Sequence, residues 1–226
     1  KQRPQDGRFF SSLLERFRQN GRVMVTVTVT AMTLSKQALD NNHNIYTGRL
    51  PDELLPSEEQ FERLWELHPK KFPTCMIYGR EMAMPRWHQA FGRNHRFSGI
   101  TREASPVNAD LAPYLAWAHQ AIDGELNGLL VNWFDGKLGH YIGKHRDSEI
   151  GIQEGSSYVT ISFGEARILR LRKWKGSDRL DFPVENGSIA IIPYATNRAW
   201  THEIPKSKRA SGRRISVTMR AFNSDP

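Results

Sequence analysis

The chain has 226 residues, enough for one catalytic domain, and its 32 Lys and Arg against 24 Asp and Glu give a formal net charge of +8. A surplus of this sign favours polyanionic partners such as nucleic acid. No apolar run approaches the ~20 residues of a membrane-spanning helix, and a single cysteine, Cys75, excludes an intramolecular disulfide. We therefore expect an intracellular protein, nuclear or cytoplasmic, that is monomeric and does not bind membranes.

The amino-terminal residues stand apart from the motifs described below. Apolar residues recur at helical spacing within residues 12–19, and valine alternates with threonine over most of residues 23–30. These patterns predict a helix and then a strand. We assign residues 1–42 to an amino-terminal extension and residues 43–226 to one domain. The role of the extension is left open between a lid, an additional strand and a dimer contact.

Two further helices are predicted along the chain. Ser57 and Gln60 have the spacing of a capping box at the start of the first helix, and apolar residues follow them at helical spacing. The second helix is predicted over residues 113–126, where aromatic and alanine residues recur with the same period. We assign the aromatic residues of both helices to the core.

Beyond the second helix the pattern changes to short apolar runs that are separated by glycine-containing turns. We predict strands at residues 129–134, 158–163, 167–171 and 188–192. Helices followed by strands favour an α+β domain with a double-sheet jelly-roll core.

His145 and Asp147 form an H-x-D motif, and His202 follows further along the chain. If residues 141–147 form a strand, both side chains of the motif point to one face and toward one ion. Two histidines and one carboxylate are the ligands of the facial triad that holds non-haem iron(II), and this triad leaves positions open for a cosubstrate and dioxygen. Because an H-x-D motif also occurs often by chance, the segment after His202 is needed to support this interpretation.

Residues 214–220 alternate strictly between polar and apolar side chains. The polar face carries Arg214, Ser216, Thr218 and Arg220. On alternation alone this pattern describes an edge strand whose polar face meets water. A guanidinium, however, binds a carboxylate through two parallel charge-assisted hydrogen bonds, so Arg214 also fits an anchor for an acidic cosubstrate.

With these residues in place, the chain resembles the AlkB family of iron(II)- and 2-oxoglutarate-dependent dioxygenases from about Ile45 to Phe222. The likeness rests on Asn132-Trp-Phe-Asp-Gly, Ile142-Gly-Lys-His-Arg-Asp-Ser-Glu149, Ser162-Phe-Gly-Glu-Ala-Arg, Asn186-Gly-Ser-Ile-Ala-Ile-Ile-Pro, Trp200-Thr-His-Glu-Ile-Pro-Lys and Arg214–Arg220. The resemblance implies a double-stranded β-helix core with flanking N-terminal helices. It also implies Fe(II), 2-oxoglutarate and O2 as cofactor and cosubstrates.

The same resemblance implies roles for individual residues. Iron would be bound by His145, Asp147 and His202, and 2-oxoglutarate by Arg214, Arg220, Asn132 and Ser216. Two positions depart from the pattern of the family. Phe134 stands where the family usually has a tyrosine that hydrogen-bonds the cosubstrate, and Ser216 replaces an asparagine. Both departures concern cosubstrate contacts and leave the metal ligands unaffected.

Residues 76–100 resemble the segment with which AlkB homologues that act on nucleic acid cover the substrate base. By this likeness Tyr78 enters the base stack, Phe97 stacks on the extruded base, and Arg86 contacts the substrate. An enzyme that acts on a base atom must take the nucleotide out of the duplex, and a wedge fills the gap. Tyr78 and Phe97 also fit ordinary half-buried aromatic residues, so both interpretations stay open.

Two further features bear on the substrate. Glu149 lies two residues beyond the H-x-D motif and would either contact a base edge or stand as an exposed acid at the end of a strand. Five basic residues occur within residues 206–214. We expect Lys206, Lys208 and Arg209 to contact phosphates of a nucleic acid.

The resulting hypothesis is an Fe(II)- and 2-oxoglutarate-dependent dioxygenase that oxidatively demethylates alkylated nucleobases in DNA or RNA. By the chemistry of the family, the N-methyl group is hydroxylated and lost as formaldehyde. One alternative is an oxygenase of the same fold that acts on a protein, lipid or small molecule, for which Tyr78 and the basic loop would be incidental. A second alternative is a catalytically silent nucleic-acid-binding module, against which the intact triad argues.

Overall fold

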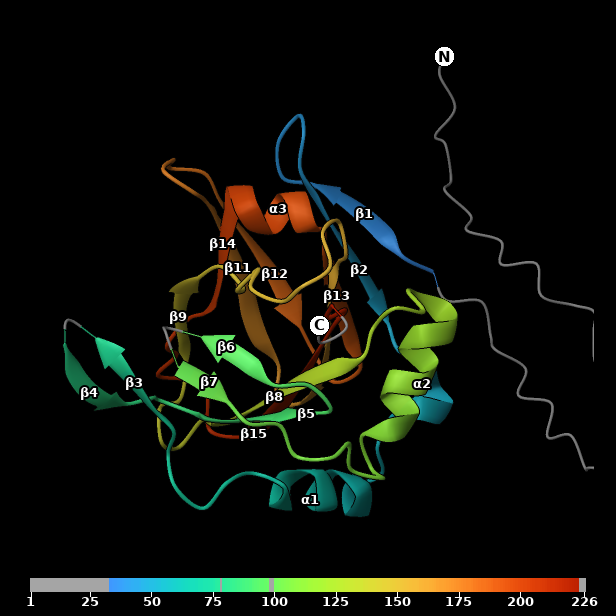
Figure 1. The fold of residues 1–226 in the computed structure, drawn as a ribbon, viewed down its shortest axis with the longest axis vertical. Helices are drawn as coiled ribbons and strands as arrows, with labels where there is room; N and C mark the ends of the chain where they lie inside the picture. Colours follow the sequence, from blue (N-terminus) through green and yellow to red (C-terminus); the bar gives the residue numbers. More distant parts are fainter. Residues whose placement is uncertain (1–32, 78, 98–99, 224–226) are drawn as a thin grey trace, which may run out of the picture. The chain divides into compact units, whose positions relative to one another are not determined.

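The computed structural model describes residues 33–77, 79–97 and 100–223 (Figure 1). The helix predicted at residues 12–19 and the strand predicted at residues 23–30 lie outside the described residues. The fold is mostly β-sheet with few helices, and all of its paired strands within the sheets are antiparallel.

Two sheets form the body of the described domain (Figure 1). The larger sheet has seven strands in the order β1 (Ser35–Ala38), β2 (Asn44–Arg49), β13 (Ser188–Ile192), β10 (Tyr158–Gly164), β15 (Arg213–Arg220), β8 (Gly128–Asp135) and β5 (Trp87–Phe91). The smaller sheet has four, in the order β12 (Arg179–Val184), β11 (Arg167–Lys173), β14 (Trp200–Ile204) and β9 (Ile142–His145). Strand β1, which lies in the range assigned to an amino-terminal extension, pairs with β2 as an edge strand of the larger sheet.

The predicted lid segment, residues 76–100, divides between a sheet strand and two hairpins. Strand β5 pairs with β8 in the larger sheet. One hairpin consists of β3 (Thr74–Ile77) and β4 (Arg80–Ala83), and the other of β6 (His95–Phe97) and β7 (Ile100–Arg102). Both hairpins are two-stranded sheets of their own, separate from the two main sheets.

The helices are a short 3-10 turn at Asp52–Leu54, α1 (Glu58–Glu66), α2 (Ala112–Ala121) and α3 (Tyr194–Ala199). The predicted capping box of α1 is confirmed, because the hydroxyl of Ser57 accepts from the Gln60 amide at 3.2 Å and the Gln60 side chain accepts from the Ser57 amide at 2.8 Å. Helix α2 ends five residues before the predicted end. The carboxylate of Asp123 accepts from the Glu125 amide, and this turn replaces further helix. Among the described residues, no helix is long and apolar enough to cross a membrane.

The four strands predicted after α2 are confirmed as β8, β10, β11 and β13, with ends that differ by two residues or fewer. Strand β9 was predicted over residues 141–147 but stops at His145. Strand β14 and helix α3 were not predicted, because both are short and α3 has only six residues.

Strand β15 lies in the middle of the larger sheet, between β10 and β8, so the interpretation of residues 214–220 as an edge strand is wrong. Its apolar side chains, Ile215, Val217 and Met219, belong to the core cluster that includes residues of α1 and α2. Its polar side chains are buried as well, on the opposite face of the sheet. The alternation in this strand therefore separates an apolar core from a polar interior.

Helices α1 and α2 cover the apolar face of the larger sheet. Residues of α1 and α2 share one buried cluster with alternate residues of β8, β10, β13 and β15. The indole nitrogen of Trp133 in β8 donates to the carbonyl oxygen of Leu64 in α1 at 2.9 Å. A second cluster, which includes Phe134, Leu171 and Trp200, joins residues of the two sheets. The two clusters pack against opposite faces of the larger sheet. The polar side chains of its central strands point toward the smaller sheet.

We predict that Gly164, at the end of β10, is required for stability. Its φ of +81° is left-handed, and a Cβ at this position would lie 2.3 Å from the carbonyl oxygen of Arg213 and 2.9 Å from the ring of Phe61. Gly164→Ala should lower the free energy of unfolding by roughly 1–2 kcal/mol because of the left-handed backbone, and by a further ~1–3 kcal/mol because of overpacking. Urea denaturation measures this loss.

Gly151 supplies the matched control, since its φ of +74° is similar and nothing lies within 4 Å of its virtual Cβ. Gly151→Ala should therefore show only the smaller, conformational part of the loss. Equal losses in the two variants would contradict the packing role of Gly164.

Candidate metal and cosubstrate site

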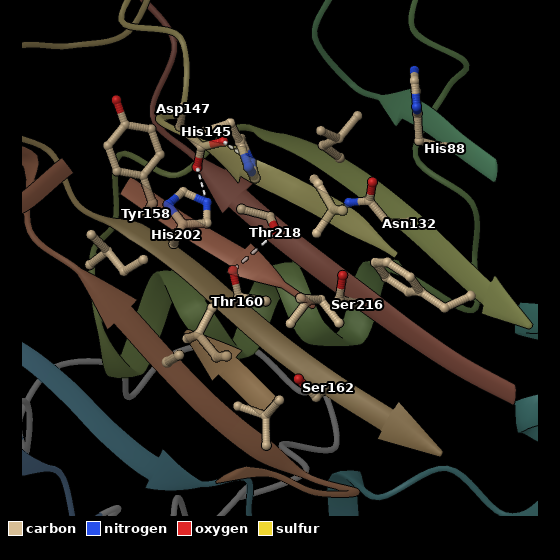
Figure 2. A pocket seen from close by; sticks show the side chains of 18 of the residues that line it. His88, Asn132, His145, Asp147, Tyr158, Thr160, Ser162, His202, Ser216 and Thr218 are labelled. Carbon is tan, nitrogen blue, oxygen red and sulfur yellow. Dashed lines mark hydrogen bonds and ion pairs between the residues drawn. The ribbon is translucent and has the colours of Figure 1, made fainter. Parts of the chain in front are cut away.

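A cavity lies between the polar face of the larger sheet and the smaller sheet (Figure 2). Strands β8, β10 and β15 contribute residues from one side, and β9, β11 and β14 from the other. Three residues of the predicted lid segment, Arg86, His88 and His95, also line it.

His145, Asp147 and His202 converge at one part of this cavity, and Figure 2 shows their side chains turned toward one another. His145 in β9 and His202 in β14 are directly paired across the smaller sheet, with ring centroids 4.3 Å apart. The carboxylate oxygens of Asp147 lie 3.9 Å from Nε2 of His145 and 4.0 Å from Nε2 of His202. One ligand atom from each residue lies within 4.8 Å of the others, a spacing that fits one metal ion.

Asp147 reaches this position without being part of a strand, which corrects the predicted geometry. Strand β9 ends at His145, and Asp147 is held instead by Asn197 of α3. The Asp147 amide donates to Oδ1 of Asn197 at 2.9 Å, and Nδ2 of Asn197 donates to the Asp147 carbonyl at 3.0 Å. Arg146 does not line the cavity, and its guanidinium lies 4.5 Å from the ring centroid of Trp174.

Arg220 pairs directly with the Asp147 carboxylate, at 2.8 Å between Nη2 and Oδ1. Burial raises the pKa of Asp147, but the positive charge of Arg220 and the neighbouring imidazoles of His202 and His145 outweigh that effect. The pKa of Asp147 therefore lies below its usual value, and the carboxylate is ionised at neutral pH.

The two histidines are neutral and suitably oriented to act as ligands. Burial, followed by the proximity of His202, lowers the pKa of His145 to about 3, and burial also lowers the pKa of His202. Nδ1 of His145 lies 2.9 Å from the carbonyl oxygen of Gly143. Because a carbonyl can only accept, Nδ1 carries the hydrogen and Nε2 presents its lone pair to the cavity.

A second cationic group, Arg214, lies at the other end of β15, six residues and about 20 Å of strand from Arg220. Its Nη2 donates to the hydroxyl of Ser162 at 2.9 Å, whereas Nε and Nη1 are buried without a hydrogen-bond partner. Burial, followed by the charge of Arg167, lowers the pKa of Arg214 to about 9, so it stays protonated at neutral pH. Buried donors without partners are costly, and a carboxylate in the cavity would satisfy both.

A row of polar side chains crosses the sheet between these two ends. His88, Asn132 and Ser216 occupy paired positions on β5, β8 and β15, and Ser162 on β10 continues the row. Figure 2 shows these side chains on the same face of the sheet. Asn132 and Ser216 therefore line the wall of the cavity beside Arg214, and their contact with the cosubstrate stays a prediction.

Arg86, predicted to contact the substrate, is buried and donates from Nε to Oδ1 of Asn132 at 2.7 Å. His88 and His95 line the same cavity, and the pKa of each is lowered to about 3, first by burial and then by a neighbouring arginine. Sequence reasoning missed both histidines, because neither belongs to a metal-ligand spacing. Their position beside Arg86 in the lid segment was the available signal.

The other predicted substrate residues either are not part of the cavity lining or lie outside the described residues. Tyr78 lies outside the described residues, as does the side chain of Phe97. Glu149 accepts a hydrogen bond from Tyr194 at 3.1 Å and lies 3.7 Å from Arg198, so it faces α3. The cations of the basic loop, Lys206, Lys208 and Arg209, are exposed between β14 and β15.

Comparison with known proteins agrees with this geometry. Residues 90–220, more than half of the chain, match the family model of the 2OG-Fe(II) oxygenase superfamily. The chain is 24% identical to human DNA oxidative demethylase ALKBH2 over 200 residues, which cover 81% of this chain and 74% of the relative. It is 25% identical to bovine alpha-ketoglutarate-dependent dioxygenase alkB homolog 3 over 188 residues, which cover 77% of this chain and 64% of that one.

The solved structure of OsALKBH1 has a similar fold. It superposes with a TM-score of 0.56 at 12% sequence identity, and the match covers 83% of this chain and 100% of that chain. The matched family requires Fe(II), 2-oxoglutarate and O2. The cluster of two histidines and one carboxylate has the donor set that this iron needs. The chain belongs to the 2OG-Fe(II) oxygenase superfamily, and within it to the AlkB family of Fe(II)- and 2-oxoglutarate-dependent dioxygenases.

Proposed function

We propose that this protein oxidatively demethylates alkylated bases of nucleic acid. The observation that carries the proposal is one cavity that joins an ionised Asp147, two neutral histidines and the guanidinium of Arg214, of which Nε and Nη1 have no hydrogen-bond partner. The relatives named above as a DNA oxidative demethylase and an alkB homologue support a nucleic acid substrate. We further propose that the seven- and four-stranded sheets are the two walls of a double-stranded β-helix.

In this proposal His145, Asp147 and His202 hold the iron, which with 2-oxoglutarate and dioxygen supplies the oxidation of the N-methyl group. Arg214 binds the distal carboxylate of 2-oxoglutarate, and Asn132 and Ser216 contact the cosubstrate along its length. Arg220 keeps Asp147 ionised and fixes the direction of its carboxylate. The protein needs no nucleophile of its own, since its contribution is to orient the reactants and to exclude water.

The substrate side rests on the lid segment and on surface charge. We propose that residues 76–100 cover the target base, with Tyr78 in the base stack and Phe97 on the extruded base, and that Lys206, Lys208 and Arg209 contact phosphates. Arg86 has a different part, because it is buried against Asn132. This contact joins the lid segment to Asn132, which in this proposal contacts 2-oxoglutarate. Arg86 would therefore take part both in covering the base and in holding the cosubstrate.

The function is tested with a panel of oligonucleotides that carry different N-methylated bases, as single strands and as duplexes. The iron-loaded protein should release formaldehyde and restore the unmodified base, and both products are followed by mass spectrometry. A panel that stays fully methylated while 2-oxoglutarate is still consumed would favour the alternative of a protein, lipid or small-molecule substrate.

The metal assignment predicts the loss of turnover in Asp147→Ala. Removing one of three protein ligands should cost more than the ~10–100-fold typical of an outer-sphere residue. Fe(II) affinity and formaldehyde release measure the effect. Ser148→Ala is the matched control, since the Ser148 hydroxyl accepts from the nearby Ile150 amide at 3.3 Å and Ser148 is not part of the cavity lining. Full activity of Asp147→Ala would refute the assignment.

The anchor assignment predicts that Arg214→Ala raises the concentration of 2-oxoglutarate required for half-maximal turnover. A lost charge-assisted hydrogen bond corresponds to ~1.5–3 kcal/mol, or roughly ten- to over a hundredfold. Arg213→Ala is the control, because the adjacent Arg213 pairs with Glu62 and lies over the rings of Phe61 and Trp65, away from the cavity. Equal requirements in wild type and Arg214→Ala would place the anchor elsewhere.

A further inference from the structure

Three neighbouring loops carry exposed cations on the outside of the domain. They contain residues 70–72 before β3, residues 137–139 after β8, and residues 206–209 between β14 and β15. We call this the three-loop surface. Its cations are Lys70, Lys71, Lys137, Lys206, Lys208 and Arg209, all of them exposed.

The three loops are held together by specific contacts. Nη2 of the buried Arg167 donates to the carbonyl of His140 at 3.1 Å and to that of Pro205 at 3.0 Å, which joins the second loop to the third. The Gly136 amide donates to the carbonyl of Gly212 at 2.8 Å. Phe72 of the first loop lies edge-on to His140, with ring centroids 5.4 Å apart. The surface is therefore a built part of the fold.

Charge on this surface is uncompensated within the described residues. No ion pair there joins any of its six cations to a carboxylate, and two acids next to the loops, Asp135 and Glu165, bind backbone amides. Asp135 accepts from the Lys137 amide at 2.8 Å, and Glu165 accepts from the Ser211 and Gly212 amides at 2.8 and 2.9 Å. A surface of this kind attracts a polyanion.

An aromatic ring accompanies these charges. Phe72 is 40% exposed, and its ring stacks on Trp87 at 4.8 Å with an interplanar angle of 9°. Trp87 is held in turn by a stacked contact with His68, at 4.3 Å. Phe72 is thus fixed by a rigid neighbour while part of its surface stays open to solvent. An exposed ring among unpaired lysines is the combination that binds bases and phosphates of an unpaired strand.

We propose that the three-loop surface binds single-stranded nucleic acid, with its cations on the phosphates and Phe72 stacked on a base. The inference rests on the proposed function, which supplies the strand. It goes beyond the basic loop at residues 206–209 by adding two loops and a stacking residue. The surface adjoins the cavity through the chain itself, since Trp87 follows Arg86 and His140 lies two residues before Ile142, and both Arg86 and Ile142 line the cavity.

The experiment measures binding alone, by fluorescence anisotropy with a labelled, unmethylated single-stranded oligonucleotide and the corresponding duplex. Phe72→Ala should weaken single-strand binding by roughly five- to a hundredfold through lost stacking, with a much smaller effect on the duplex. Phe72→Tyr keeps the ring and should bind as the wild type does. Melting temperatures of both variants show that the fold is retained.

The charges are tested by the dependence of binding on salt. The binding constant falls as salt rises, and Lys70→Gln/Lys71→Gln should make this dependence shallower. The magnitude of the slope of log K against log salt should decrease by up to ~1.4, about 0.7 for each lost phosphate contact on a single strand. Lys36→Gln/Arg179→Gln removes the same charge from exposed positions on β1 and β12 and serves as the matched control. An equal change of slope in both pairs would show a general charge effect and overturn the proposed surface.

Failure of this inference is distinguishable from failure of the proposed function. If the wild type releases formaldehyde from a methylated oligonucleotide while Phe72→Ala and Lys70→Gln/Lys71→Gln bind as it does, the surface is wrong and the function stands. If no oligonucleotide is demethylated but the two variants lose binding as expected, the surface stands and the proposed function fails.

Discussion

The buried ion pair between Arg220 and Asp147 is the contact on which the rest of the site depends. Arg220 is 2% exposed and Asp147 lies in a part of the cavity crowded with imidazoles. An unpaired carboxylate there would take up a proton, and a neutral carboxyl is a poor metal ligand. Removing one partner of a buried pair typically costs 3–5 kcal/mol, because the other charge stays buried without compensation. The ionisation of the proposed metal ligand Asp147 therefore depends on the position of strand β15, which carries Arg220.

The charge of the cavity favours an anionic cosubstrate. Among the described residues that line it, three guanidiniums, of Arg86, Arg214 and Arg220, face one carboxylate. Burial lowers the pKa of Arg86 to about 10 and that of Arg214 to about 9, yet both stay protonated at neutral pH. His88 and His95 add no charge, because their pKa values lie near 3. A dicarboxylic acid offsets this surplus, whereas an uncharged ligand of the same size would leave it buried.

The residues that could be predicted from the sequence are those whose partners lie nearby in the chain or whose pattern is periodic. The capping box of α1 joins residues three apart, and the alternation within β15 is visible in residues 214–220, so both were found. The burial of both faces of β15 depends on which strands pair with it, and alternation carries no information on that. Asn197 orients Asp147 from a short helix fifty residues away, and a lone asparagine in a short segment gives no sign of such a contact. The contact of Arg86 with Asn132 spans forty-six residues, so it was equally invisible in the sequence, and Arg86 was assigned only to the substrate.

The order of strands in the larger sheet has a consequence for biosynthesis. Strand β15 comes last in the described chain but lies between β10 and β8, so every hydrogen bond across the middle of the sheet waits for it. While residues 213–220 are still in the ribosomal tunnel, β8 and β10 have no partner on their facing edges, and the apolar side chains of the core cluster are open to other chains. Unpaired edges of this kind are the usual route to aggregation. Nascent chains of this protein should therefore need protection until β15 has left the ribosome, and a truncation that removes β15 should yield insoluble protein instead of a smaller domain.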